Sequence, residues 1–171
     1  DSLVASFSSY GPSADGQVKP DVASVGAPAM VQGTANNIGF NNGTSFSCPN
    51  MAGLSACLWQ AFPEVNNMRI IRALRQASHK ANNPDNRMGY GIPNMKLAFS
   101  TLLIEYATSS ATLADCSATI SWNSKDVSAM KYEIERKLPN ENNYSKVGEL
   151  NPQAGDVLAN RTYNFSNTIV S

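Results

Sequence analysis

Charged side chains are scarce in this sequence. Lys, Arg, Asp and Glu together make up 15% of the chain, and the 13 basic residues balance the 13 acidic ones to a formal net charge of zero. Nothing in this balance indicates the basic surface that binds nucleic acid or anionic membranes. No stretch approaches the roughly 18 consecutive apolar residues of a membrane-spanning helix. We therefore expect neither a nucleic-acid partner nor a membrane span.

Cysteine and histidine are too few and too dispersed for a zinc site. The chain has three cysteines, Cys48, Cys57 and Cys116, and one histidine, His79, and no spacing among them resembles a zinc motif. Cys48 and Cys57 are nine residues apart on one apparent helix. That separation corresponds to about 13 Å of helical rise, which is too far for a disulfide. We expect buried thiols and no metal site.

The chain begins at Asp1 instead of methionine, and strand-like residues follow at once. We therefore expect it to be part of a longer protein. Its 171 residues suit one ordinary domain, or one and a half small ones. The composition changes after Leu103, which predicts a domain boundary near residues 101–106. The predicted domains are 1–103 and 104–171.

The first part alternates turns with helical patterns. Short strands are expected within residues 1–33, and an Asn- and Gly-rich loop over 34–43. Ser45 to Phe62 is apolar on nearly every face, as in a buried central helix that Pro63 ends. A second helix is expected over 67–78 and a short final one over 95–100. The apolar positions of the second helix are Met68, Ile71, Leu74 and Ala77.

The second part has β patterns only. Four strands are predicted at intervals of roughly 10 residues, separated by Asn, Pro and Gly loops, which is typical of a sandwich. They cover residues 117–122, 130–138, 144–150 and 161–170.

Ser45 lies where a loop becomes a helix. The first N–H groups of a helix have no internal partner and stand at the positive end of its dipole. An oxyanion that forms beside Ser45 would meet these donors. Pro49 has no N–H to bond the Ser45 carbonyl, and this fixes the helix start close to Ser45. The alternative from local physics is that Ser45 or Thr44 is only an N-cap.

Four sequence blocks, in order, resemble those of the subtilisin-like serine peptidases. "GTSFSCPNMAG" is similar to the active-site serine motif of that family. "FSSYGP" and "KPDVASVGA" resemble two blocks that precede the serine, and "GYGIPNMKLA" resembles the block that closes the catalytic domain. The serine motif matches at Gly43, Thr44, Ser45, Ser47, Pro49, Ala52 and Gly53. The resemblance covers residues 1 to about 103 and implies the C-terminal portion of a doubly wound α/β domain.

The resemblance implies that Ser45 is the nucleophile of an Asp-His-Ser triad that cleaves polypeptides. The Ser45 N–H would be one oxyanion donor, and Asn42, Gly43 and Thr44 would line the substrate cleft. The family's Asp and His precede the serine in the chain, but His79 follows Ser45, and neither Asp15 nor Asp21 is a triad candidate. We therefore expect both partners upstream of this chain, which should be inactive alone and need the upstream part of its own domain.

No cofactor is expected in this segment. The resemblance implies calcium as a stabilising ion of the full-length family, yet this segment has no dense Asp/Asn loop to bind it.

The stretch from Ala118 to Leu150 resembles part of a fibronectin type III-like module. Trp122, Tyr132 and Ile134 would face its interior, and the module is still incomplete at Ser171. Such a module after a subtilisin-like domain implies a secreted or cell-surface protein, of bacterial origin. A generic β appendage with packing roles only is the alternative.

Two other functions stay open. The protein could be a catalytically dead pseudo-peptidase, or an adhesion or binding module of a secreted protein, and the upstream sequence would separate these from an enzyme. A different serine hydrolase is disfavoured because no Gly-x-Ser-x-Gly elbow surrounds Ser45. Substrate preference cannot be read from this segment.

Overall fold

The computed structural model describes residues 4–127 and 129–169, and it divides into two compact units. The first unit is Asp1–Leu102 and the second is Leu103–Ser171. The division falls within the last helix of the first unit, inside the region where we expect a boundary. The expected strand that starts at residue 2 lies partly outside the described residues.

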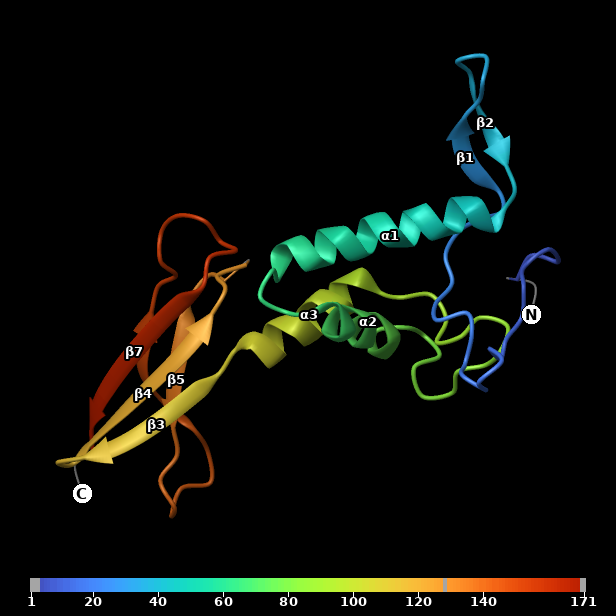
Figure 1. Ribbon diagram of the computed structural model, residues 1–171. Helices are drawn as coiled ribbons and strands as arrows, with labels where there is room; N and C mark the ends of the chain where they lie inside the picture. The colour runs from blue at the N-terminus through green and yellow to red at the C-terminus, as the bar shows by residue number, and fades with distance from the viewer. Residues whose placement is uncertain (1–3, 128, 170–171) are drawn as a thin grey trace. The chain divides into compact units, whose positions relative to one another are not determined.

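The first unit contains a hairpin followed by three helices (Figure 1). Its strands β1 and β2 pair antiparallel, with Met30 opposite Phe40. The elements are β1 (Ala29–Gln32), β2 (Ile38–Asn41), α1 (Thr44–Ala61), α2 (Asn67–Gln76) and α3 (Met95–Tyr106). The mixture of helices and strands agrees with an α/β class, while the doubly wound sheet stays a prediction.

The predicted strands before residue 29 are wrong for the described residues. Residues 4–28 form no strand, and part of the predicted loop over 34–43 is strand β2. Prolines and glycines interrupt residues 11–28 too often for a regular ladder. Their backbone groups instead bond to the loop that follows α2, as in Gly11 N–H to Asn86 O (2.8 Å) and Ala23 N–H to Gly91 O (2.9 Å).

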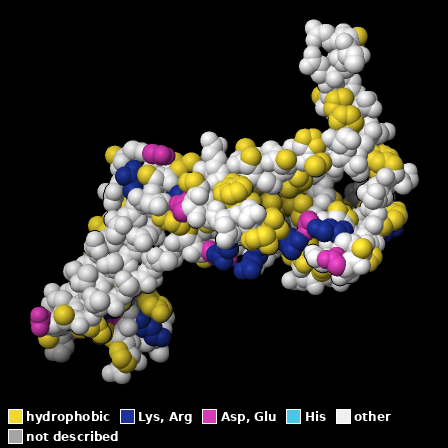
Figure 2. Space-filling view, in the orientation of Figure 1, with side chains coloured by type: hydrophobic (Ala, Val, Ile, Leu, Met, Phe, Trp, Pro, Cys, Tyr) yellow, Lys and Arg dark blue, Asp and Glu magenta, His cyan; other side chains and the backbone are white. Residues whose placement is uncertain are grey.

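Helix α1 is confirmed, but its predicted burial is not. Only Leu58 and Ala61 are buried along its length. Leu54 and Trp59 are exposed at 37% and 44%, and Figure 2 shows hydrophobic side chains gathered along this region. An all-round apolar helix is stable in water only when other elements cover it. Among the described residues, cover that buries side chains of α1 is confined to its C-terminal end, and residues 24–26 contact its first turns.

The core of the first unit lies where the end of α1 meets the other helices. Phe62 follows α1 directly, is fully buried, and its ring centroid is 5.1 Å from that of Phe99 on α3. Ala98 and Leu102 of the same helix are also buried. Helix α3 is a turn and a half longer than predicted because its apolar residues continue to Leu103 and Ile104.

Helix α2 begins with a side-chain cap. Asn66 Oδ1 accepts from the Arg69 N–H at 3.0 Å. The predicted apolar face is wrong in part, because Met68 is 60% exposed. The face that packs inward is rotated toward Ile70. Its buried residues are Ile70, Ala73, Leu74 and, directly after the helix, Ala77.

The second unit contains two antiparallel sheets. The three-stranded sheet has the order β3-β4-β7 and the two-stranded sheet pairs β5 with β6. The four predicted strands are confirmed with small changes in bounds, whereas β3 was not predicted. The strands are β3 (Ser109–Ala114), β4 (Ser117–Ser124), β5 (Tyr132–Arg136), β6 (Ser145–Leu150) and β7 (Arg161–Thr168).

Aromatic rings from both sheets meet inside the second unit. Trp122 on β4 stacks on Tyr163 of β7 with centroids 5.3 Å apart, and Tyr132 of β5 tilts against both rings. Ile134 and Tyr163 are buried. This packing agrees with inward positions for Trp122, Tyr132 and Ile134. The sandwich and the fibronectin type III-like identity stay predictions.

Candidate functional site

The predicted site residues form one continuous turn at the start of α1. Thr44 is the first helical residue and Ser45 the second, and both side chains are exposed. Gly43 is the N-cap, and no side-chain capping bond forms there within the described part of the chain. The reading of Ser45 or Thr44 as an N-cap is therefore wrong. The Ser45 hydroxyl is exposed beside N–H groups that helix geometry leaves free.

The first turn is held together by its own backbone and one hydroxyl. Phe46 N–H donates to Gly43 O at 3.1 Å, and Ser47 Oγ donates to Thr44 O at 3.1 Å. Pro49 lies inside the helix, so the Ser45 carbonyl has no donor four residues on. No acidic residue stands in this first turn. The turn therefore keeps its positive dipole end uncompensated by side chains.

One backbone hydrogen bond connects the loop before Ser45 to an earlier segment of the chain. The N–H of Gly43 donates to the carbonyl of Gly26 at 2.8 Å. The neighbouring Asn42 has an exposed side chain, and its N–H donates to Asn41 Oδ1 at 3.1 Å. A Cβ added to Gly43 would lie 3.6 Å from the Phe46 ring and 3.8 Å from the Ser45 nitrogen. These are ordinary contact distances, so Gly43 is held through its N–H without a steric clash at its Cα.

His79 is occupied elsewhere. Its Nδ1 accepts from the Ile92 N–H at 2.9 Å, and Gly91 packs against the ring closely enough that a Cβ there would lie 2.5 Å from His79 Cε1. The side chain thus fastens the segment after α2 to the loop near residue 92. This arrangement agrees with the prediction that His79 is no partner of Ser45.

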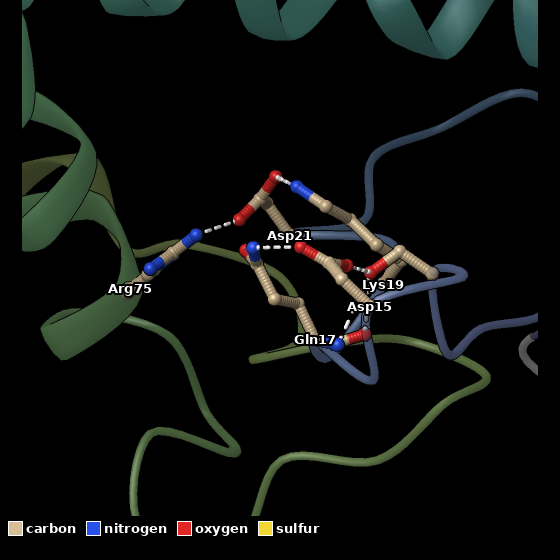
Figure 3. Close-up of polar contacts among 6 residues, drawn as sticks. Asp15, Gln17, Lys19, Asp21 and Arg75 are labelled. Atoms are coloured by element: carbon tan, nitrogen blue, oxygen red, sulfur yellow. Dashed lines mark hydrogen bonds and ion pairs between the residues drawn. The ribbon is translucent and has the colours of Figure 1, made fainter.

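Asp21 belongs to an ion-pair cluster. One carboxylate oxygen accepts from Arg75 of α2, and the other from Lys19 Nζ at 2.6 Å (Figure 3). Partial burial raises the pKa of Asp21, but the hydrogen bonds from Lys19 and Arg75 outweigh it and hold that pKa below the ordinary value. The Arg75 guanidinium also lies 5.2 Å from the centroid of the Tyr90 ring. Asp21 thus ties its loop to α2.

Asp15 lies in an exposed turn of its own. Its carboxylate accepts from Ser13 Oγ at 2.5 Å and from Gln17 Nε2 at 2.6 Å (Figure 3). These bonds, that of Ser13 first, lower the pKa of Asp15. Neither Asp15 nor Asp21 has a described contact with Ser45, in agreement with their exclusion from a triad.

The described residues form neither a metal site nor a disulfide. No group of three or more His, Cys, Asp or Glu side chains there could hold a metal ion. Cys48, Cys57 and Cys116 are all free and exposed, so the prediction of buried thiols is wrong. Two of them lie on α1, whose surface is largely uncovered. In the described part of the chain, no helix is both long and apolar enough to cross a membrane.

Sequence patterns did not predict which residues of an earlier segment brace the loop before Ser45. Besides Gly26, Ser24 takes part, because its Oγ accepts from Asn50 Nδ2 at 3.1 Å. The available signal was a glycine in a block that precedes the serine motif, since such a glycine often marks close backbone approach.

A model of the subtilase family, peptidase S8, matches residues 1–91. The match covers the hairpin, the turn of Ser45, α2 and the loop that holds His79. It spans more than half of the chain, and the chain therefore belongs to the subtilase family. That membership indicates the serine peptidase class of hydrolases, a class whose substrates are polypeptides.

Proposed function

We propose that this chain is the nucleophile-bearing part of a serine endopeptidase, with Ser45 as the nucleophile. One observation carries the proposal. In a chain of the subtilase family, the Ser45 hydroxyl is exposed in the first helical turn and caps nothing there. A serine placed only for helix stability would occupy the N-cap, which is Gly43.

The proposed chemistry uses this turn in two ways. Ser45 Oγ attacks the scissile carbonyl carbon while a histidine base takes its proton, and the same proton later goes to the leaving amine. The Ser45 N–H donates to the oxyanion, and the positive end of α1 favours that charge. Asn42, Gly43 and Thr44 line the substrate cleft beside it. Water then hydrolyses the acyl-enzyme and restores the Ser45 hydroxyl.

The base and its orienting carboxylate lie upstream in this proposal. The described residues supply no such pair, since His79 is bound to Ile92 and Asp21 to Lys19 and Arg75. The exposed apolar surface of α1 supports the same view, because upstream elements of the same domain would cover it. The 171-residue chain is then inactive alone, since an unactivated hydroxyl is a poor nucleophile at neutral pH.

We also propose a secreted or cell-surface setting, in a bacterium, on the strength of the resemblance of the second unit. We propose a partial fibronectin type III-like domain, residues 104–171, after the catalytic part, residues 1–103. The two sheets and the Trp122 cluster support this proposal. We propose that the calcium of the complete domain binds outside this segment, and no group of three or more His, Cys, Asp or Glu among the described residues could hold a metal ion. A pseudo-peptidase or adhesion module is the second candidate, favoured because no described residue stands as a base beside Ser45.

The test is peptide hydrolysis by the complete protein and its Ser45→Ala variant. We expect Ser45→Ala to lower turnover by several orders of magnitude, with Ser55→Ala, which removes a hydroxyl farther along α1, retaining most activity. Equal hydrolysis by the parent protein and Ser45→Ala would end the assignment of Ser45. No hydrolysis by a folded parent protein would favour the pseudo-peptidase.

A further inference from the structure

Residues 19–26 form a strap whose C-terminal end reaches the loop before Ser45. The Gly26 carbonyl accepts the Gly43 N–H at 2.8 Å. Two residues earlier, Ser24 Oγ accepts from Asn50 Nδ2 at 3.1 Å, and Asn50 lies directly after Pro49 on α1. The strap therefore contacts both the residue before the helix and the helix itself, on either side of Ser45 in sequence.

The N-terminal half of the strap is anchored on a separate part of the first unit. Tyr90 N–H donates to Asp21 O and Ala23 N–H donates to Gly91 O, both at 2.9 Å. The Asp21 carboxylate adds its ion pairs to Lys19 and to Arg75 of α2 (Figure 3). These contacts hold the strap over residues 19–23, and they thereby restrain the position of the Gly26 carbonyl.

Gly26 also has no room for a side chain. A Cβ added there would lie 2.8 Å from the Gly43 carbonyl oxygen and 3.4 Å from Ser47 Cβ. The first of these atoms is backbone, so relief requires moving Gly43 itself. Any displacement of Gly43 passes to Thr44 and Ser45, because Gly43 is the N-cap of their helix and its carbonyl accepts the Phe46 N–H.

We propose that Gly26 is a positioning residue for the nucleophile, with Ser24 as its support. Gly26 sets the position of Gly43, and through it the Ser45 hydroxyl and the Ser45 N–H that meets the oxyanion. This inference rests on the proposed function of Ser45. It predicts an effect on the chemical step, because a displacement near 1 Å in a reacting group lowers turnover by up to about 100-fold.

The test compares Gly26→Ala with Gly39→Ala in the complete protein. Gly39 lies on β2 and an added Cβ there meets nothing within 4 Å. We expect Gly26→Ala to lower kcat by roughly 10- to 100-fold with KM nearly unchanged, and Gly39→Ala to leave both nearly unchanged. Equal kcat values for the two variants would overturn the role of Gly26.

A second pair keeps the inference testable if Gly26→Ala does not fold. Ser24→Ala removes the bond to Asn50, while Ser24→Thr keeps the hydroxyl. We expect a several-fold fall in kcat for Ser24→Ala and recovery in Ser24→Thr. A fall of the same size in both variants would indicate a packing role and overturn the support role of Ser24.

Amide hydrogen exchange separates this inference from the proposed function. The Gly43 N–H should be protected in the parent protein and lose protection in Gly26→Ala, whether or not the protein hydrolyses peptides. An unprotected Gly43 amide in the parent would overturn the inference while leaving Ser45 as nucleophile. A protected amide in a protein whose Ser45→Ala variant hydrolyses peptides equally well would instead reject the proposed function.

Discussion

Single residues in this chain are fixed by close backbone approaches more than by side-chain bulk. Gly89 shows this most clearly, since it has φ +61 and an added Cβ would lie 1.8 Å from Pro20 O and 2.5 Å from Asp21 O. Both obstacles are backbone atoms of the strap that leads to Gly26. Gly16 has a similar φ of +79, yet an added Cβ there meets nothing within 4 Å. Both glycines have a positive φ, but a side chain would collide with other atoms only at Gly89. Comparing the two positions therefore distinguishes the cost of a steric clash from the cost of the backbone conformation.

Gly89→Ala should destabilise the first unit by more than about 2 kcal/mol, and Gly16→Ala by roughly 1 kcal/mol. The difference reflects the collision with Pro20 and Asp21. Hydrogen exchange of the Tyr90 amide, which donates to Asp21 O, measures the local loss of stability at this contact. Equal protection of this amide in the two variants would contradict the steric argument.

Asp126 gives the second unit an acid-sensitive network. It is buried, and its carboxylate accepts from Tyr132 Oη and Tyr163 Oη at 2.6 Å and from Gln153 N–H at 3.0 Å. Burial raises the pKa of Asp126, but these bonds outweigh it and leave the pKa below its ordinary value. Burial and the Asp126 carboxylate raise the pKa of Tyr132 to about 12.

Asp126→Asn should destabilise the second unit by roughly 2–3 kcal/mol at neutral pH, because an amide cannot accept all three bonds. Since the folded pKa is depressed, the stabilisation is complete above about pH 4 and is lost as pH falls through the folded value. Asp126→Asn should remove this acid dependence.

Urea unfolding between pH 2 and 7, followed by Trp122 fluorescence in a Trp59→Phe background, measures this loss. Asp115→Asn, in an exposed turn, is the matched control and should change stability by less than about 0.5 kcal/mol. A pH profile of Asp126→Asn that parallels the parent would contradict the role given to Asp126.

Among the elements, α1 depends most on what surrounds it. Gly53 lies in its interior and is exposed, and an added Cβ meets nothing within 4 Å. In the 171-residue chain, Gly53→Ala should therefore stabilise α1 by roughly 0.5–1 kcal/mol through helix propensity.

The same substitution should be destabilising in the complete protein, where we propose that upstream elements cover α1. Thermal unfolding of both forms, with and without Gly53→Ala, measures the sign of each change. Stabilisation of equal size in both forms would mean that α1 stays uncovered in the complete protein.

The helices were predictable because their signals are local. Apolar spacing and Pro63 located α1 and α2, and the short β patterns located β4 to β7. The strands predicted before residue 29 failed because their alternation carries no information on partners, and the backbone bonds instead to residues 86–91. Strand β3 was missed because its six residues are all exposed and give no inward face to detect.

The candidate site was predictable only in part for the same reason. Asn42 to Ser45 form one segment, so a motif locates them together. The brace from Ser24 and Gly26 depends on contacts across 17 to 26 residues, which no local pattern encodes. The burial of α1 was predicted wrongly because an apolar pattern along a helix does not say which elements cover it.

At the scale of the whole molecule, the division between the two units falls within a helix of the chain and not in an exposed linker. Helix α3 runs through the division between Leu102 and Leu103. Proteases cut exposed loops sooner than they cut helices, because the chain that is cut must be extended in the active site of the protease. The loop between β5 and β6 is the better candidate, since residues 139–144 are all exposed.

Limited proteolysis of the complete protein should therefore cut within 139–144 before it cuts within 101–106. Mass spectrometry of the early fragments identifies the sites. First cuts inside α3 would contradict its continuity as a helix. First cuts inside α1 would contradict the proposal that upstream elements cover it.

The central claim is that Ser45 becomes an activated nucleophile only in the complete protein. Labelling with a fluorophosphonate, followed by mass-spectrometric mapping of the adduct, tests it directly because the reagent reacts with activated serines. We predict one adduct, on Ser45, in the complete protein, and none in its Ser45→Ala variant or in the 171-residue chain alone. An adduct on a different serine, or equal labelling of the complete protein and the 171-residue chain, would contradict the account.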